Sequence, residues 1–337
     1  MTTVLDSLNA GLQAAFAANQ RVLLLGEDVL DPYGGAFKVT RGLSTQFPGR
    51  VLTTPISEAG ITGAGIGLAL GGFRPIVEIM FGDFLTLAMD QLINAAGKFG
   101  WMYNPPVQLP LVLRTPMGGR RGYGPTHSQT LEKHLLGAPG LTVLAPFHLA
   151  GSDRLGEPGR LLRDAILQFN GPLVFIENKL QYLLPLLAPD ELSEFDLDCS
   201  GSPLSPAYRL RLADAPPASL SLATYGYMAE LCCQAMLQLA YEHEIFVELV
   251  VLTQLAPFDP GPILDSVQRT RRLLTVEEGG RSLGWGAEIL AQVTEAIPGI
   301  VAGRVAALDL PVPASPTLES QVLPDLEQIL QAVKKMV

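Results

Sequence analysis

The sequence predicts a two-domain α/β protein in which each domain is a mostly parallel sheet with helices on both faces. A chain of 337 residues is longer than a domain with one hydrophobic core usually is. Because 48% of its residues are hydrophobic and 17% are charged, it has enough apolar side chains for two cores. Short apolar runs bounded by Gly or Pro alternate with helical patterns along most of the chain. These observations favour two successive α/β units joined by an irregular segment.

The first domain is expected over residues 1–182. It opens with an amphipathic helix within residues 1–20, and the strand-like run Val51–Ser57 precedes an almost uncharged segment, 59–72, that predicts a buried helix. The other apolar runs that predict strands are, in chain order, Arg21–Gly26, Pro75–Met80, Leu109–Arg114, Leu141–Ala145 and Pro172–Glu177. Short apolar strands of this kind are typical of a sheet buried on both faces.

Residues 183–217 are rich in Pro, Leu, Ser and acidic residues, so we expect them to connect the domains. The second domain is expected over residues 218–337. Its predicted elements are strands near Leu220–Tyr225, Phe246–Val251 and Arg272–Val276, a helix over Met228–His243 and a closing helix over Leu323–Val337.

Composition excludes several classes of function. The net charge of −10 argues against a nucleic-acid partner, because such binding depends on clustered Lys and Arg. No apolar run reaches the roughly 18 residues that cross a bilayer, since Arg74 and several glycines interrupt the best candidate. Cys199, Cys232 and Cys233 lack metal-ligand spacing, and the first 20 residues do not resemble a secretory leader. We therefore expect a cytoplasmic protein without structural disulfides or a membrane partner.

Glu58 is the first candidate for chemistry. It is expected at the mouth of the buried helix, where an unpaired charge is costly and a ligand donor could satisfy it. A simpler role also fits, in which Ser57 caps the helix and Glu58 faces its dipole for roughly 0.3–1 kcal/mol. The glycine-rich run that follows is not a dinucleotide loop, because Leu68 stands where the third glycine of G-x-G-x-x-G would fall. The local pattern leaves both roles of Glu58 open.

An ordered series of segments connects Glu58 with a known family. The segments are Leu25-Gly-Glu-Asp28, Gly34-Gly-Ala-Phe-Lys-Val-Thr-Arg-Gly42, Thr54-Pro-Ile-Ser-Glu58-Ala-Gly60, Gly72-Phe-Arg-Pro-Ile-Val-Glu-Ile-Met-Phe-Gly-Asp-Phe84, Asp90-Gln-Leu-Ile-Asn94, Thr126-His-Ser-Gln129, Ala138-Pro-Gly-Leu141, Thr275-Val-Glu-Glu-Gly-Gly280 and Gly286-Ala-Glu288. In this order, over nearly the whole chain, they resemble the beta subunit of the thiamine-diphosphate-dependent, decarboxylating component of pyruvate-type 2-oxoacid dehydrogenase complexes, in the transketolase superfamily. The resemblance implies a pyrimidine-binding first domain and a transketolase C-terminal-like second domain.

The resemblance assigns roles to four residues. Glu58 corresponds to the carboxylate that hydrogen-bonds a ring nitrogen of the aminopyrimidine and favours the tautomer that activates the thiazolium carbon. Phe84 corresponds to the ring that packs against the aminopyrimidine, and Ile56 is placed beside the cofactor. His127, in a glycine-rich loop, is expected to serve the active site in the reductive acylation step. Phe81 is interpreted as an ordinary core phenylalanine.

The resemblance also implies a partner and metal ions. The superfamily's other domain holds Mg²⁺ and the diphosphate through Gly-Asp-Gly and a later Asn, and this sequence has no match to that pattern. The chain is therefore expected to hold the pyrimidine half of thiamine diphosphate, with an alpha subunit holding the rest in an alpha2beta2 heterotetramer. Some members hold K⁺ through backbone carbonyls, which would correspond to Leu111, Ala165, Ile166, Gln168 and Asn170. The Gly/Pro-rich stretch 151–160 departs from the family pattern beside these positions.

The activity implied by the resemblance is that of an oxidoreductase acting on an oxo group with a disulfide acceptor. A 2-oxoacid, expected to be pyruvate, would be decarboxylated and its acyl group passed to a lipoyl group on an acyltransferase partner. Two alternatives remain open: a two-component transketolase-like enzyme that uses an aldehyde or a carrier-protein thiol as acceptor, and a noncatalytic scaffold for an alpha chain. The presence of Glu58, Phe84 and His127 together counts against the scaffold.

Overall fold

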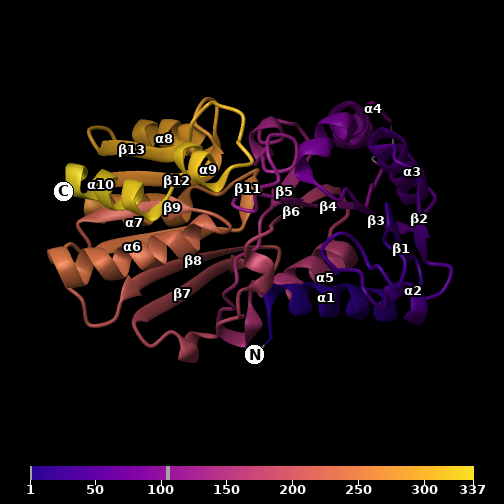
Figure 1. Ribbon diagram of the computed structural model, residues 1–337, viewed down its shortest axis with the longest axis horizontal. Helices are drawn as coiled ribbons and strands as arrows, with labels where there is room; N and C mark the ends of the chain where they lie inside the picture. Colours follow the sequence, from indigo (N-terminus) through magenta and orange to yellow (C-terminus); the bar gives the residue numbers. More distant parts are fainter. Residues whose placement is uncertain (1, 104–106) are drawn as a thin grey trace.

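The computed structural model describes residues 2–103 and 107–337 and places them in two α/β domains that lie side by side (Figure 1). The strands of the first sheet are β1 (Val22–Gly26), β2 (Val51–Thr53), β3 (Arg74–Glu78), β4 (Leu111–Met117), β5 (Thr142–Leu144), β6 (Pro172–Asn178) and β11 (Gln254–Ala256). Their spatial order is β11-β5-β6-β4-β3-β1-β2, and every neighbouring pair is parallel except β11 with β5. The predicted α/β fold class is confirmed.

Helices cover both faces of the first sheet. They are α1 (Val4–Ala18), α2 (Leu43–Gln46), α3 (Glu58–Leu70), α4 (Gly97–Met102) and α5 (Pro158–Gln168), with short turns η1 (Gly82–Ala88), η2 (Gln91–Ala96), η3 (Glu132–His134) and η4 (Ser152–Arg154). Helices α1 and α5 pack together on one face and α3 packs on the other. The α1–α5 crossing is tight, because a Cβ added at Gly11 would lie 2.1 Å from the carbonyl oxygen of Gly159.

The second domain contains a six-stranded sheet in the order β13-β12-β9-β10-β8-β7. Its strands are β7 (Phe195–Ser202), β8 (Ser205–Leu212), β9 (Leu220–Thr224), β10 (Val247–Leu252), β12 (Arg272–Gly280) and β13 (Val301–Ala307). Two short turns, η5 (Gln181–Leu183) and η6 (Pro189–Glu191), precede this domain. Its helices are α6 (Met228–His243), α7 (Gly261–Thr270), α8 (Trp285–Ala296), α9 (Pro316–Val322) and α10 (Leu326–Met336). Helices α6 and α10 cover one face, and α7 and α8 cover the face toward the first domain.

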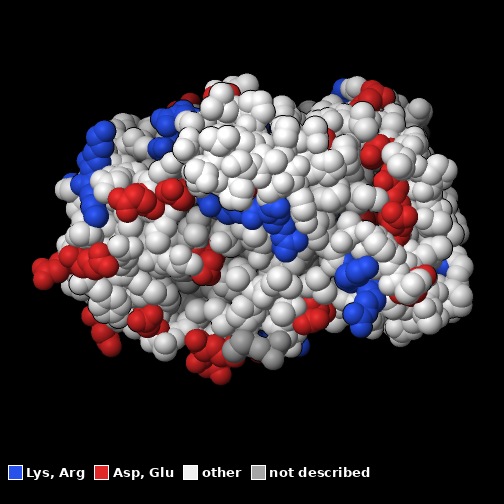
Figure 2. Space-filling view, viewed as in Figure 1, with Lys and Arg blue, Asp and Glu red and all other residues white. Residues whose placement is uncertain are grey.

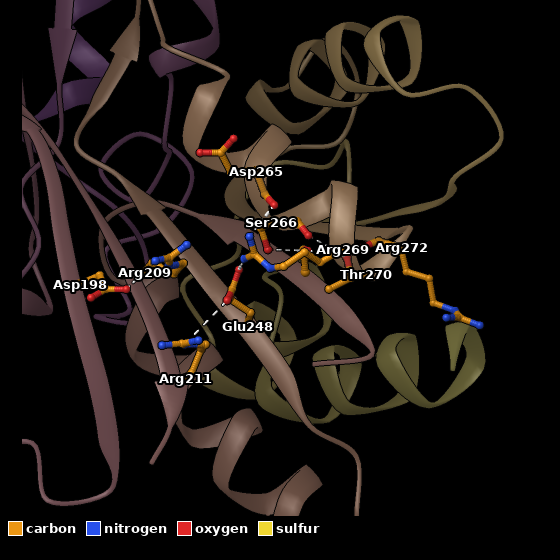
Figure 3. A network of polar contacts seen from close by, with 10 residues as sticks. Asp198, Arg209, Arg211, Glu248, Asp265, Ser266, Arg269, Thr270 and Arg272 are labelled. Carbon is orange, nitrogen blue, oxygen red and sulfur yellow. Dashed lines mark hydrogen bonds and ion pairs between the residues drawn. The ribbon is translucent and has the colours of Figure 1, made fainter. Parts of the chain in front are cut away.

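The segment expected as a plain connection supplies a β-hairpin to the second sheet. Strands β7 and β8 pair with each other, and β8 pairs with β10 in antiparallel fashion. Polar contacts fix this hairpin (Figure 3): Arg209 donates to Asp198 across it at 2.5 Å. Arg211 of β8 and Arg269 of α7 both pair with the carboxylate of Glu248, which is buried on β10. The hairpin is thus part of the second domain.

The two domains share a core. Strand β11 leaves the second domain and adds to the edge of the first sheet beside β5. One continuous cluster of buried side chains includes Leu113 and Val174 of the first sheet together with Trp285 and Ile289 of α8. The second domain therefore contacts the first sheet both at its edge and through α8. None of the helices in the described part of the chain is long and apolar enough to cross a membrane.

Candidate active site

Four loops meet at one edge of the first sheet. Strands β2, β1, β3 and β4 are adjacent and parallel, so their carboxyl ends lie at the same edge, which is where open α/β sheets bind ligands. Glu27 follows β1, Glu58 follows β2, Phe81 and Phe84 follow β3, and His127 lies in the loop after β4. The residues singled out for chemistry in the sequence therefore come from loops that the topology brings to one edge.

Glu58 is the first residue of α3, and only 6% of its surface is exposed. Ser57 caps the helix, its side-chain oxygen accepting from the backbone N–H of Gly60 at 3.3 Å. Among residues 2–103 and 107–337, no group hydrogen-bonds the Glu58 carboxylate and no Lys, Arg or His pairs with it. A buried carboxylate in this state can accept a hydrogen bond, or share a proton, with a ligand at the helix mouth.

Glu27 lies beside Glu58 and was not singled out from the sequence. It is buried, and its Oε1 atom has no hydrogen-bond partner within the described residues. Burial raises the pKa of Glu27, and the neighbouring carboxylates of Glu58 and Asp28 raise it further. Burial and the two neighbouring carboxylates thus favour the protonated form of Glu27. The only sequence signal for Glu27 was its place in the segment Leu25–Asp28.

The rings of Phe84 and His127 meet at this edge. Their centroids lie 5.1 Å apart in an edge-to-face arrangement, and the Phe81 centroid lies 4.7 Å from that of His127. The Nδ1 atom of His127 lies 2.9 Å from Oγ1 of Thr126, which fixes the ring orientation. Phe81 also contacts Tyr123 at a centroid distance of 6.0 Å, so the residue expected to belong to the core lies at the centre of an aromatic cluster.

Ile56 differs from these residues in its exposure. With 82% of its surface exposed, it precedes the α3 cap and projects from the chain. It belongs to none of the buried clusters of residues 2–103 and 107–337, so its side chain is available to a ligand or to another subunit.

The loop that carries His127 is anchored on the second domain. The backbone N–H of Gly119 donates to Oε1 of Glu278 at 2.6 Å, and the backbone N–H of Arg120 donates to Oε1 of Glu319 at 2.7 Å. Glu278 also accepts from Asn178 at 3.0 Å. The late segment Thr275–Gly280, which the sequence comparison with the family included, thus supports the loop around His127 from across the domain boundary.

The positions expected for K⁺ lie around the end of α5 and the start of β4. Arg74 already supplies a positive charge there: its Nε atom donates to the Ile166 carbonyl at 2.5 Å and Nη2 to the Phe169 carbonyl at 2.5 Å. Nη1 of Arg74 lies 3.2 Å from the side-chain oxygen of Asn170. The backbone carbonyl of Asn170 accepts from the backbone N–H of Leu109. Leu111, Ala165 and Gln168 occupy neighbouring positions. A potassium ion would have to share or displace the hydrogen bonds of Arg74.

Surface charge is mixed on the face shown in Figure 2. Lys and Arg side chains form small separate groups on this face, and Asp and Glu groups lie between and around them. Broad uncharged areas separate the groups. A phosphate-binding stripe would instead require basic side chains in a continuous row.

Comparison with known proteins identifies both domains. The model of the transketolase pyrimidine-binding domain matches residues 2–183, and that of the transketolase C-terminal domain matches residues 214–329. A solved structure described as a split-gene transketolase, an inactive beta4 tetramer, superposes with a TM-score of 0.75 at 18% identity, covering 100% of this chain and 98% of that one. This likeness shows the fold.

Sequence relatives are more specific. The chain is 36% identical to the mitochondrial pyruvate dehydrogenase E1 component subunit beta-1 of Arabidopsis thaliana, over 99% of this chain and 88% of the relative. It is 34% identical to the pyruvate dehydrogenase E1 component subunit beta of Leifsonia xyli, over 98% of this chain and 94% of the relative. It is 32% identical to the human mitochondrial subunit beta, over 99% of this chain and 90% of the relative. The chain therefore belongs to the E1 component beta-subunit family, in which a transketolase pyrimidine-binding domain is followed by a transketolase C-terminal domain.

Proposed function

We propose that this chain is the beta subunit of a thiamine-diphosphate-dependent 2-oxoacid dehydrogenase component, with pyruvate as substrate and a lipoyl disulfide as acyl acceptor. The observation that carries the proposal is the buried Glu58 carboxylate, which lies at the ligand-binding edge of the sheet without a partner among the described residues. The names of the relatives support the same activity.

The residues at this edge fit the pyrimidine half of the cofactor. Glu58 would hold a proton at a ring nitrogen, the Phe84 ring would pack on the heterocycle, and the exposed Ile56 side chain would add an apolar contact. When bound, thiamine diphosphate supplies the carbon nucleophile and accepts the electrons released with CO₂. The diphosphate and Mg²⁺ are assigned to the alpha subunit, because this sequence lacks the Gly-Asp-Gly and Asn pattern.

His127 is assigned to the transfer of the acyl group. Its ring contacts Phe81 and Phe84, and Nδ1 is engaged by Thr126, so we assign Nε2 to the reacting group. An imidazole can donate a proton to a lipoyl sulfur as its disulfide opens. Phe81 and Phe84 limit rotation of the ring.

Exposed apolar side chains indicate where the alpha subunit docks. Ile56 before α3, Leu87 in η1, and Trp101 and Met102 in α4 are exposed by 82%, 58%, 87% and 52%. The elements that carry them adjoin, since α3 contacts η1 and η2 and η2 contacts α4. Large exposed apolar side chains on adjoining elements are typical of a protein interface. An alpha subunit seated over these residues closes the site above Glu58, and two such pairs give the proposed alpha2beta2 heterotetramer.

The proposal is tested by purifying the chain alone and with its alpha partner. Decarboxylation of a panel of 2-oxoacids is followed with thiamine diphosphate and Mg²⁺, first with an artificial electron acceptor and then with a lipoylated acyltransferase domain. Activity is expected only in the complex, fastest with pyruvate, with acyl transfer to the lipoyl domain. Transfer to an aldehyde or a carrier-protein thiol instead would establish the transketolase-like alternative. A complex that binds cofactor but turns over none of these substrates would leave the scaffold role.

The K⁺ site is a separate part of the proposal. Thermal unfolding of the complex is compared in KCl and NaCl at equal ionic strength, for the wild type and for Arg74→Met. A site at the end of α5 raises the unfolding midpoint in KCl alone. Equal midpoints in the two salts, in both proteins, would remove K⁺ from the proposal.

A further inference from the structure

Lys179 is a buried cation beside the active site that has no role in the proposed function. It follows β6, and its backbone N–H donates to the carbonyl of Met117 at 3.0 Å, which extends the pairing of β6 with β4. None of its surface is exposed. No carboxylate of the described residues forms an ion pair with it, so contacts of other kinds hold the ammonium group in place.

The ammonium group of Lys179 lies under the His127 loop. Its Nζ atom donates to the backbone carbonyl of His127 itself. The same atom lies 5.4 Å from the ring centroid of Phe81 and 5.5 Å from that of Tyr123, within the range of cation–π attraction. Phe81 in turn contacts the His127 ring at 4.7 Å. The lysine therefore touches both the main chain of His127 and the ring that supports its side chain.

Asp83 holds the other end of the same turn. Its Oδ1 atom accepts from the side chain of Gln129 at 2.9 Å and from its backbone N–H at 3.3 Å. Asp83 is buried, and its Oδ2 atom has no hydrogen-bond partner in the described part of the chain. The Lys179 ammonium group thus holds His127, and the Asp83 carboxylate holds Gln129.

We propose that Lys179 is a positioning residue for His127, which in its protonated form holds the His127 main chain and ring in the geometry required for acyl transfer. The proposal rests on the role given to His127 in the proposed function. A neutral amine would attract the carbonyl and the two ring faces far less strongly, so the loop is held only while the ammonium group is charged.

The charge state of Lys179 responds to pH in a reachable range. Burial lowers the pKa of Lys179 to about 8, against the opposing effects of Asp83 and Glu278. Arg121 also lowers the pKa and Glu319 raises it. Above this pH the ammonium group loses its proton, and the acyl-transfer rate is expected to fall with the same midpoint.

The test uses the assembled complex with Lys179→Met and Lys179→Arg. Lys179→Met is expected to lower kcat for acyl transfer to the lipoyl domain by about 100-fold, as expected when a reacting group is misplaced. Its KM for the 2-oxoacid, its affinity for thiamine diphosphate and its unfolding midpoint stay near wild type. Lys179→Arg keeps the charge, so it restores part of the rate and moves the alkaline limb of the pH profile to higher pH. Lys133→Met is the matched control, since Lys133 also donates to a backbone carbonyl, that of Ser282.

A double-mutant cycle separates positioning from structural support. If Lys179 acts through His127, adding Lys179→Met to His127→Asn lowers the rate no further than His127→Asn alone. Additive losses, a wild-type rate in Lys179→Met, or an alkaline limb unmoved by Lys179→Arg would each overturn the proposal. Failure of the proposed function is distinguished by Glu58→Gln, whose full activity would remove the cofactor assignment whatever Lys179 does.

Discussion

Two groups of buried carboxylates in the first sheet differ in their partners. Glu78 and Glu177 flank Arg114, whose Nε donates to Glu177 at 2.8 Å and whose guanidinium also pairs with Glu78. Glu58 and Glu27 are buried to a similar degree, but no cation within the described residues pairs with either. The first group is complete within the fold, whereas the second leaves Oε1 of Glu27 and the Glu58 carboxylate without a hydrogen-bond partner among the described residues.

This difference indicates which acids are structural. A buried ion pair contributes little net stability, but removal of one partner leaves a costly uncompensated charge. A buried carboxylate that has no partner in the folded chain lowers the free energy of unfolding. Such a carboxylate is typical of a site that a ligand completes. Replacing single members of each group therefore tests the comparison.

Arg114→Met is expected to have the largest effect on stability. It leaves Glu78 and Glu177 buried without their cation, which costs about 3–5 kcal/mol in the free energy of unfolding. Urea denaturation measures the change. The control is Arg209→Met, because the Arg209–Asp198 pair is half exposed and its loss costs less than about 1 kcal/mol. Equal costs for the two variants would contradict the distinction between buried and exposed pairs.

Glu277 extends the comparison to the domain boundary. It is fully buried, and burial first and the Glu132 carboxylate second raise its pKa from 4.5 to about 8. The folded protein therefore keeps a proton that the unfolded chain has lost, so the free energy of unfolding falls as pH rises from 4.5 to 8. Glu277→Gln removes this slope in urea denaturation at a series of pH values. An unchanged slope would show that Glu277 ionises normally in the fold.

Phe84→Leu tests the aromatic side of the site. Stacking on a heteroaromatic ring is worth about 0.5–1.5 kcal/mol beyond burial, so the Kd for thiamine diphosphate should rise roughly 2- to 10-fold. Titration calorimetry on the complex measures it. Phe47→Leu is the control, since Phe47 packs on Phe16 at a centroid distance of 5.3 Å and lies outside the aromatic cluster of the site. A rise of equal size in the control would remove the assignment of Phe84.

Ser57→Ala separates the two roles considered for Glu58. The Ser57 side chain accepts from the Gly60 N–H, and loss of such a cap costs about 1 kcal/mol. Glu58→Gln replaces a buried carboxylate that has no partner among the described residues, so its free energy of unfolding should equal or exceed that of the wild type. If Glu58→Gln were as destabilising as Ser57→Ala, the carboxylate would act mainly on the helix dipole.

The sequence predicted the parallel strands well because buried runs such as Pro172–Glu177 are continuous and apolar. The β7–β8 hairpin was missed because Pro, Ser and acidic residues dominate the composition of residues 183–217, although Phe195–Ser200 does alternate between apolar and polar residues. Strand β11 has only three residues and pairs across the domain boundary, a contact that no local pattern specifies. Its place in the first sheet depends on tertiary packing.

The sequence also predicted only part of the candidate site. Glu58, Phe84 and His127 were found because their segments match a family in order, and the structure places all three at one edge of the sheet. Glu27, Phe81 and Lys179 were not assigned to the site, because their significance comes from neighbours distant in sequence. Lys179 reaches His127 across 52 residues, and Glu27 meets Glu58 only because β1 and β2 are adjacent.

The most direct test of the account is the exchange rate of the proton on the thiazolium carbon of thiamine diphosphate bound to the complex, measured by quenched-flow NMR in heavy water. Glu58→Gln is expected to slow this exchange by about 100-fold or more relative to wild type, while the unfolding midpoint is not lowered. Equal exchange rates in the two proteins, at full cofactor occupancy, would contradict the claim that the unpaired Glu58 carboxylate binds and activates the cofactor ring.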